Sequence, residues 1–190
     1  MKKILIVLIF SLSLTACADK YMAESQQAVD AIAADEVAVI FLRAGIFSST
    51  TQTPIAEIVN DDIKSVAILS NYTKAIHKTT PGKHFYAVGG SEAARVLEAD
   101  LEAGRFYYVY INPRIGASKA RFTFMPVEYA NDESLQKDLI SCTWLTPNAQ
   151  TESRFSEIYI EMKEKADKAF ADTGERIYMP AGYGVTRPVR

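Results

Sequence analysis

The hydrophobic pattern of the chain changes character at residue 36. From Val37 to Leu42 every residue is apolar, many are β-branched or aromatic, and the run ends at Arg43. A short apolar run of this kind is typical of a strand that is buried on both faces. A loop rich in serine and threonine follows, from Gly45 to Thr53. The folded domain is therefore expected to open with a buried strand.

Short strand-like segments then recur, separated by turn residues. In one of them, Leu97, Ala99 and Leu101 alternate with acidic residues and so share one face of a strand. The expected strands are 55–59, 65–69, 72–77, 83–88, 95–101, 105–111 and 121–129. Turn signals separate them at Asn60-Asp61-Asp62, Pro81-Gly82, Gly89-Gly90, Ala103-Gly104 and Asn112-Pro113. Short strands at this spacing predict an antiparallel β-sandwich or barrel over residues 36–129.

Helical periodicity replaces the strand pattern after residue 129. Asn131 and the acidic residues after it predict a capped helix start, with the helix ending near Ile140. A second, amphipathic helix is expected over residues 152–171, followed by Gly174 as a stop signal. Its apolar stripe is expected to dock on the sandwich, and a partner protein is the alternative. Residues 130–190 thus predict a helical extension with an irregular tail from Ile177.

The N-terminus carries the most specific motif of the chain. Lys2 and Lys3 precede an apolar run from Ile4 to Leu14, and Leu14-Thr15-Ala16-Cys17 closes it. The run is shorter than the roughly 20 residues of a spanning helix, and small residues precede the cysteine as at a signal-peptide cleavage site. The pattern resembles a bacterial lipoprotein signal with its lipobox. We therefore expect residues 1–16 to be removed and Cys17 to be lipidated.

The residues after Cys17 bear on sorting and on the tether. Ala18 follows the cysteine, and in enteric-type bacteria alanine there permits export to the outer membrane, whereas aspartate retains the protein in the inner membrane. An outer-membrane anchor facing the periplasm is expected. Residues 17–35 have little apolar periodicity and predict a tether of up to about 55 Å if fully extended.

The composition of the chain excludes some classes of function. The chain has 190 residues, enough for one domain, and a net charge of −2 without a basic patch. Nucleic acid is therefore not an expected partner. Once Cys17 is lipidated, Cys142 is the remaining cysteine, and no intramolecular disulfide can form. Its apolar surroundings predict a buried thiol.

No catalytic, cofactor or metal site is expected. His77 and His84 flank Pro81-Gly82, but two ligands are too few for structural zinc, so surface histidines of a hairpin are expected. Gly89-Gly90-Ser91 lacks the lysine of a phosphate-binding loop. Glu98, Asp100 and Glu102 are expected on a solvated strand face, and binding of a cation or a basic partner is the alternative.

Two motifs suggest a family. Pro81-Gly82-Lys83-His84 precedes a strand, and the segment from Leu101 to Val109 contains Gly104 before an aromatic run. With the strand ending at Arg43, residues 36–111 resemble the bacterial lipoprotein family known as domain of unknown function 2846. That family is similar to the carboxypeptidase-regulatory and transthyretin-like sandwiches. The resemblance implies an Ig/transthyretin-like β-sandwich and an exported, non-catalytic accessory module, with no catalytic residues to transfer.

The expected protein is a lipid-anchored module of the cell envelope that binds or scaffolds another envelope protein, through an exposed strand edge or the terminal helix. Binding of peptidoglycan or another glycan through exposed tyrosines is the alternative, since the chain contains 10 tyrosines. An envelope hydrolase is a third, less favoured reading.

Overall fold

The fold is organised around β2 (Val37–Arg43), a strand that is buried from end to end. The computed structural model describes residues 21–26, 31–45, 51–90, 92–115, 120–130 and 132–189. The side chains of β2 alternate between two hydrophobic clusters, one on each side of its sheet. A strand with one face in water would not be apolar at every position. The expectation of a doubly buried strand is therefore confirmed.

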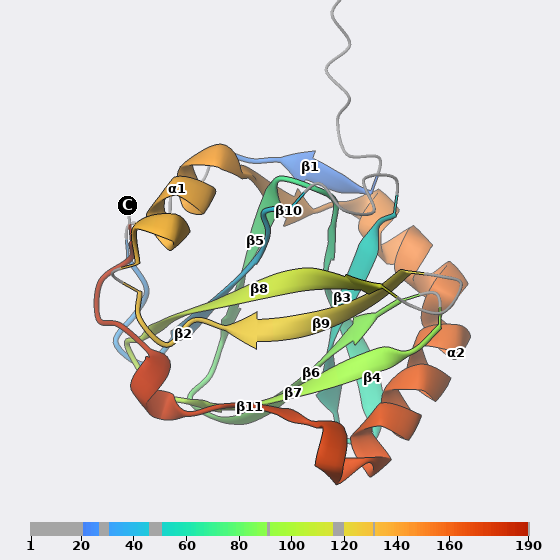
Figure 1. Ribbon diagram of the computed structural model, residues 1–190. Coiled ribbons are helices and arrows are strands. Elements are labelled where there is room, and N and C mark those ends of the chain that lie inside the picture. The colour runs from blue at the N-terminus through green and yellow to red at the C-terminus, as the bar shows by residue number, and fades with distance from the viewer. Residues whose placement is uncertain are drawn as a thin grey trace, which may run out of the picture.

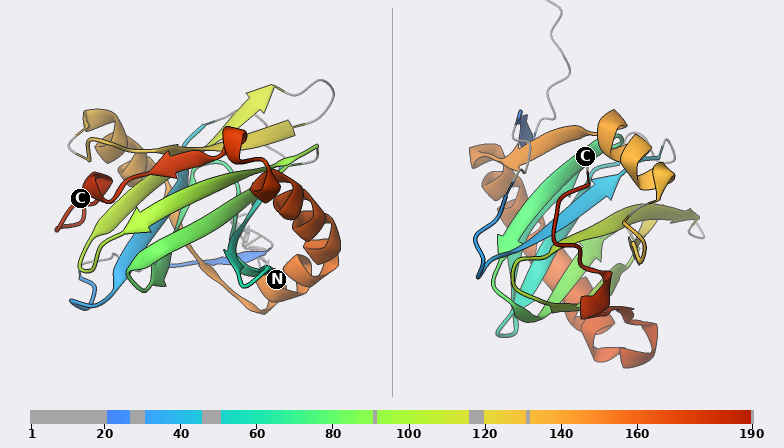
Figure 2. Two further views of the ribbon diagram at one scale, coloured as in Figure 1. Left: turned by 90° about the horizontal axis from the view of Figure 1, so that it is seen from below. Right: turned by 90° about the vertical axis from the view of Figure 1, so that its left-hand side faces the viewer.

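Two sheets pack face to face in this mainly β fold (Figures 1 and 2). The six-stranded sheet contains, in spatial order, β1 (Met22–Glu24), β10 (Thr143–Pro147), β5 (Thr73–Thr79), β2, β8 (Phe106–Ile115) and β9 (Ala120–Pro126). The five-stranded sheet contains β11 (Ile177–Met179), β7 (Ala94–Leu101), β6 (Gly82–Gly89), β3 (Thr53–Val59) and β4 (Asp62–Leu69). The expected mainly β architecture with a C-terminal helix is confirmed.

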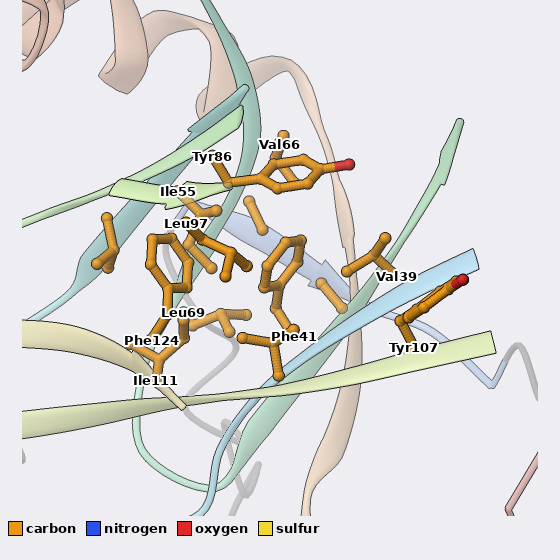
Figure 3. Packing of buried hydrophobic residues seen from close by; sticks show 14 of the residues in the cluster. Val39, Phe41, Ile55, Val66, Leu69, Tyr86, Leu97, Tyr107, Ile111 and Phe124 are labelled. Atoms are coloured by element: carbon orange, nitrogen blue, oxygen red, sulfur yellow. The ribbon is translucent and has the colours of Figure 1, made fainter. Parts of the chain in front are cut away.

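The core between the sheets centres on Phe41 (Figure 3). Its ring meets Tyr86 of the opposite sheet edge to face, with centroids 5.3 Å apart, a geometry that aromatic pairs favour. Leu97, Ala99 and Leu101 also enter this core, as their alternation in the sequence predicts.

Both outer faces of the sandwich are covered by the chain itself. On the six-stranded sheet, α1 (Glu133–Ser141) buries Leu135 and Leu139 against Ile40 of β2, and Val185 and Val189 of the C-terminal tail pack there too. On the five-stranded sheet, α2 (Ala149–Ala171) buries a stripe containing Phe155, Met162 and Ala166 (Figure 1). The long helix thus docks on its own sheet, as expected, which removes its apolar stripe as a site for a partner.

The strands are not all antiparallel, which corrects part of the expectation. The pairs β2–β8, β5–β10 and β7–β11 are parallel. The parallel arrangement arises because the chain moves repeatedly from one sheet to the other. Pro81-Gly82 joins β5 to β6 in the opposite sheet, and Gly104 lies between β7 and β8 in the same way. Both glycines have positive φ, 132° and 70°, where a side chain would be strained. The expected hairpin at Pro81-Gly82 is therefore a crossing between sheets.

Three short strands lie outside the domain bounds expected from the sequence. Met22–Glu24, in the segment assigned to the tether, pairs with β10 as an edge strand. Thr143–Pro147 and Ile177–Met179, in the segment assigned to helices and tail, extend the two sheets. The helix α2 also begins earlier than expected, because Asn148 caps it in a reciprocal capping box with Thr151. The domain thus extends beyond residues 36–129 at both ends.

Candidate functional site

The two histidines of the chain converge on one carboxylate. His77 lies on β5 of the six-stranded sheet, whereas His84 and Glu57 lie on neighbouring strands, β6 and β3, of the opposite sheet. The side chains of His77, His84 and Glu57 are 21%, 13% and 13% exposed. They are not the surface histidines of a hairpin that the sequence suggested. No sequence pattern identifies Glu57 as their partner, because it lies 20 and 27 residues from the two histidines.

Both ring nitrogens of His84 face oxygen atoms. Its Nδ1 lies 2.6 Å from Glu57 Oε1, and its Nε2 lies 2.9 Å from the backbone carbonyl oxygen of Thr80. Both partners are acceptors, and only the doubly protonated imidazolium donates from both ring nitrogens. His77 Nε2 lies 3.3 Å from the other oxygen of Glu57, without the alignment of a hydrogen bond. The geometry therefore describes a cluster that ties the two sheets together through charge.

Glu57 is held ionised within this cluster. Burial acts to raise the pKa of its carboxyl, but the contacts and charges of His77 and His84 outweigh burial and lower the pKa to about 2. Tyr86 packs against both imidazole rings, and burial raises the pKa of its phenol well above the ordinary value. The Tyr86 hydroxyl is buried without a hydrogen-bond partner among the described residues.

His84 is placed to stabilise the fold rather than to transfer a proton. A general base needs a free ring nitrogen, and both nitrogens of His84 are engaged. In the described part of the chain, no group of three or more His, Cys, Asp or Glu side chains is arranged to hold a metal ion. Among the same residues, no helix is both long and apolar enough to span a membrane.

A second buried cluster surrounds Cys142. The residue Cys142 is 4% exposed, and burial raises the pKa of its thiol to about 11. Nearby Lys74 is also buried; its ammonium donates to the backbone oxygen of Leu139 and lies 4.6 Å from the ring centroid of Trp144. Burial lowers the pKa of Lys74. The expected burial of Cys142 is confirmed, and the protonated thiol is a poor nucleophile.

A buried cation lies at the C-terminal end of β2. Arg43 is fully buried; its guanidinium donates to Thr53 Oγ1 at 3.1 Å and lies 4.8 Å from the ring centroid of Phe122. It also donates to the backbone oxygens of Thr51 and Leu69. Burial lowers the pKa of Arg43 to about 10. These contacts fasten the chain after β2 to the five-stranded sheet, which is a structural role.

The remaining candidates from the sequence have structural partners. Glu98 pairs with Lys83, Asp100 accepts from the Tyr178 hydroxyl, and Glu102 pairs with Arg105. Gly89 lies under α2, where a Cβ would meet Met162 Sδ at 2.5 Å. It and Gly90 line an open cavity of about 470 Å³ beside α2. Of the exposed tyrosines, Tyr72 lies between β4 and β5, Tyr129 lies between β9 and α1, and Tyr178 lies on β11. No ring contact joins them within the described ranges.

No protein-family model matches the chain, and no curated protein matches its sequence.

The Glu57 cluster predicts a pH-dependent stability. An unfolded carboxyl binds its proton near 4.5, whereas folded Glu57 stays ionised to about 2. The unfolded state therefore binds more protons between these values, and stability falls as the pH drops through this window. We expect Glu57→Gln to lower the free energy of unfolding at pH 6 by roughly 2 to 3 kcal/mol, and the deficit to shrink towards pH 2. Urea unfolding of the Cys17→Ser protein across this range measures it.

Glu157→Gln is the matched control, because the Glu157 side chain is 61% exposed and pairs with Arg154 on the outer side of α2. Exposed pairs contribute little, so its deficit is expected to be small at every pH. Equal, pH-independent deficits in the two variants would contradict the account of the cluster.

The Cys142 environment predicts a thiol that is inert in the folded protein. At neutral pH we expect no modification by a maleimide over hours, because the thiol is both buried and protonated. Stoichiometric labelling is expected in concentrated guanidinium chloride. Mass spectrometry of native and denatured samples checks this, and complete labelling of the native protein would show that the site opens.

Proposed function

We propose that this protein is a lipid-anchored, non-catalytic binding or scaffolding module of the bacterial cell envelope, attached to the outer membrane and facing the periplasm. The single observation that carries the proposal is the lipobox Leu14-Thr15-Ala16-Cys17 behind a short apolar run. Ala18 after the cysteine favours the outer membrane. Cys17 itself lies outside the described residues. Acyl chains anchor the protein whatever the folded domain does, since two chains already give stable attachment.

The arrangement of the domain supports binding over catalysis. Both ring nitrogens of His84 are engaged, Glu57 contacts both histidines, and burial raises the pKa of the Cys142 thiol to about 11. The resemblance of residues 36–111 to domain of unknown function 2846 implies the same kind of accessory module. A protein partner is favoured over a glycan, because the exposed tyrosines do not form a continuous aromatic surface.

β9 is one of four edge strands among the described residues, with β1, β4 and β11, and it is the edge that we propose for a protein partner. Both outer faces of the sandwich are covered by α1, the C-terminal tail and α2. Among the described strands, β9 is the last of the six-stranded sheet and pairs with β8 alone. An extended segment of another protein that adds to a sheet edge gains main-chain hydrogen bonds. Met125 of β9, 47% exposed, lies beside that edge.

Replacement of the cysteine tests the anchor. Cys17→Ser is expected to abolish incorporation of an alkyne-labelled fatty acid and to move the protein from the membrane to the soluble fraction, because the acylated thiol is lost. Fractionation with in-gel detection of the label measures both. Cys142→Ser is the matched control and is expected to retain label and membrane attachment. A Cys17→Ser protein that remains labelled and membrane-bound would contradict the proposal.

Site-specific crosslinking tests the partner edge. A photoreactive phenylalanine analogue in place of Met125 is expected to give one dominant adduct with an envelope protein. The same analogue in place of Ile160, which is 72% exposed on the outer side of α2, is expected to give none. Immunoblotting and mass spectrometry identify the adduct. Equal adducts from both positions, or none from Met125, would argue against this edge.

A further inference from the structure

The anchor and the folded domain are separated by very little chain. Tyr21 is already fixed to the domain, because its backbone oxygen accepts from the Thr151 hydroxyl of α2. Met22 is 1% exposed in the core, and β1 pairs with β10 from Met22 opposite Pro147 to Glu24 opposite Leu145. Only four residue steps lead from Cys17 to Tyr21, a span of at most about 14 Å. The predicted free tether of residues 17–35, with a reach of about 55 Å, is therefore wrong, because the chain is already attached to the domain at Tyr21.

This short connection brings one particular side of the molecule to the anchor. In Figure 1, β1, β10, α1 and the first turns of α2 gather along the upper side, while β11 lies along the lower side. We call the surface formed by residues 22–26 and 139–147 the β1–α1 surface. Its two parts lie side by side, since Ser25 N donates to the Trp144 backbone oxygen at 2.9 Å. Together they line an open cavity of about 630 Å³.

The side chains on this surface are suited to a lipid headgroup region. Ile140 is 79% exposed, more than any other large apolar residue in the described part of the chain. It follows Leu139, which is buried, and lies in the last turn of α1. Trp144 is half-buried beside it, and tryptophan is enriched at membrane–water interfaces because its ring is amphipathic. The exposed neighbours Ser141, Thr143 and Thr146 carry no charge, and Glu24 is the exposed acidic residue of this surface.

We propose that the β1–α1 surface lies on the phospholipid bilayer that holds the acyl chains of Cys17, with Ile140 among the headgroups. The proposal rests on the lipidation proposed above. One exposed isoleucine and one tryptophan would not hold a free domain on a bilayer. A chain of at most about 14 Å raises the effective concentration of the surface at the membrane, as any short linker does. The opposite side, with β11, then faces away from the lipid.

Fluorescence quenching on vesicles tests this orientation. The lipidated protein carries an environment-sensitive NBD probe at Ile140→Cys or, as the matched control, at Tyr178→Cys on β11, which is 54% exposed. Cys142 is buried and is expected to remain unmodified in both variants. The vesicles contain phosphatidylethanolamine and phosphatidylglycerol with a nitroxide-labelled lipid. We expect at least about two-fold stronger quenching at position 140 than at position 178, with weaker quenching by aqueous iodide. Equal quenching at the two positions would overturn the proposal.

Lengthening the chain between Cys17 and Tyr21 tests whether the short connection holds the β1–α1 surface at the bilayer. About twenty Gly and Ser residues inserted between Lys20 and Tyr21 give a flexible chain of roughly 25 Å root-mean-square length. The protein should still float with the vesicles, while lipid quenching at position 140 falls towards that at position 178. Unchanged quenching would overturn the role of the short chain.

Flotation distinguishes failure of this inference from failure of the proposed function. If the protein without the insertion does not float, lipidation fails and both proposals fall. If it floats and positions 140 and 178 are quenched equally, the anchor stands and the orientation alone is wrong.

Discussion

Burial of β2 on both faces is the constraint on which the rest of the structure depends. Val37, Val39 and Phe41 face the second sheet, and Ala38, Ile40 and Leu42 face α1 and the C-terminal tail. One strand therefore requires three layers, because either face left in water would expose several large apolar side chains. The sequence after residue 130 supplies this third layer through α1 and the C-terminal tail, which explains why these segments follow β9.

The period of the sequence predicted most of the strands and both helices, since local hydrophobic alternation reports burial directly. It did not predict β1, β10 or β11, which have three to five residues and too few positions to show a period. Pro81-Gly82 was predicted as a turn but not as a crossing between sheets, because turn residues do not encode the destination of the next strand. Glu57 escaped notice for a related reason: its histidine partners are adjacent only in the folded state.

Polar groups inside the sandwich act as ties between its layers. Glu57 connects His77 of one sheet with His84 of the other, and Arg43 connects the end of β2 with the carbonyl of Leu69. Such buried charges need partners to offset the loss of hydration. At the N-terminus β1 plays a similar part, since it fastens the first described residues to the β10 edge. The domain and the expected lipid anchor are thereby brought close together, and the free edge at β9 belongs to the other end of the same sheet.

Neutron reflectometry of the lipidated protein on a supported bilayer tests the central claim most directly, because it resolves the water layer between the headgroups and the folded domain. A domain clamped at Tyr21 and anchored at Cys17 predicts a protein layer that begins within about 14 Å of the headgroups. A hydrated gap approaching about 55 Å, the reach of a free tether up to residue 35, would contradict the account.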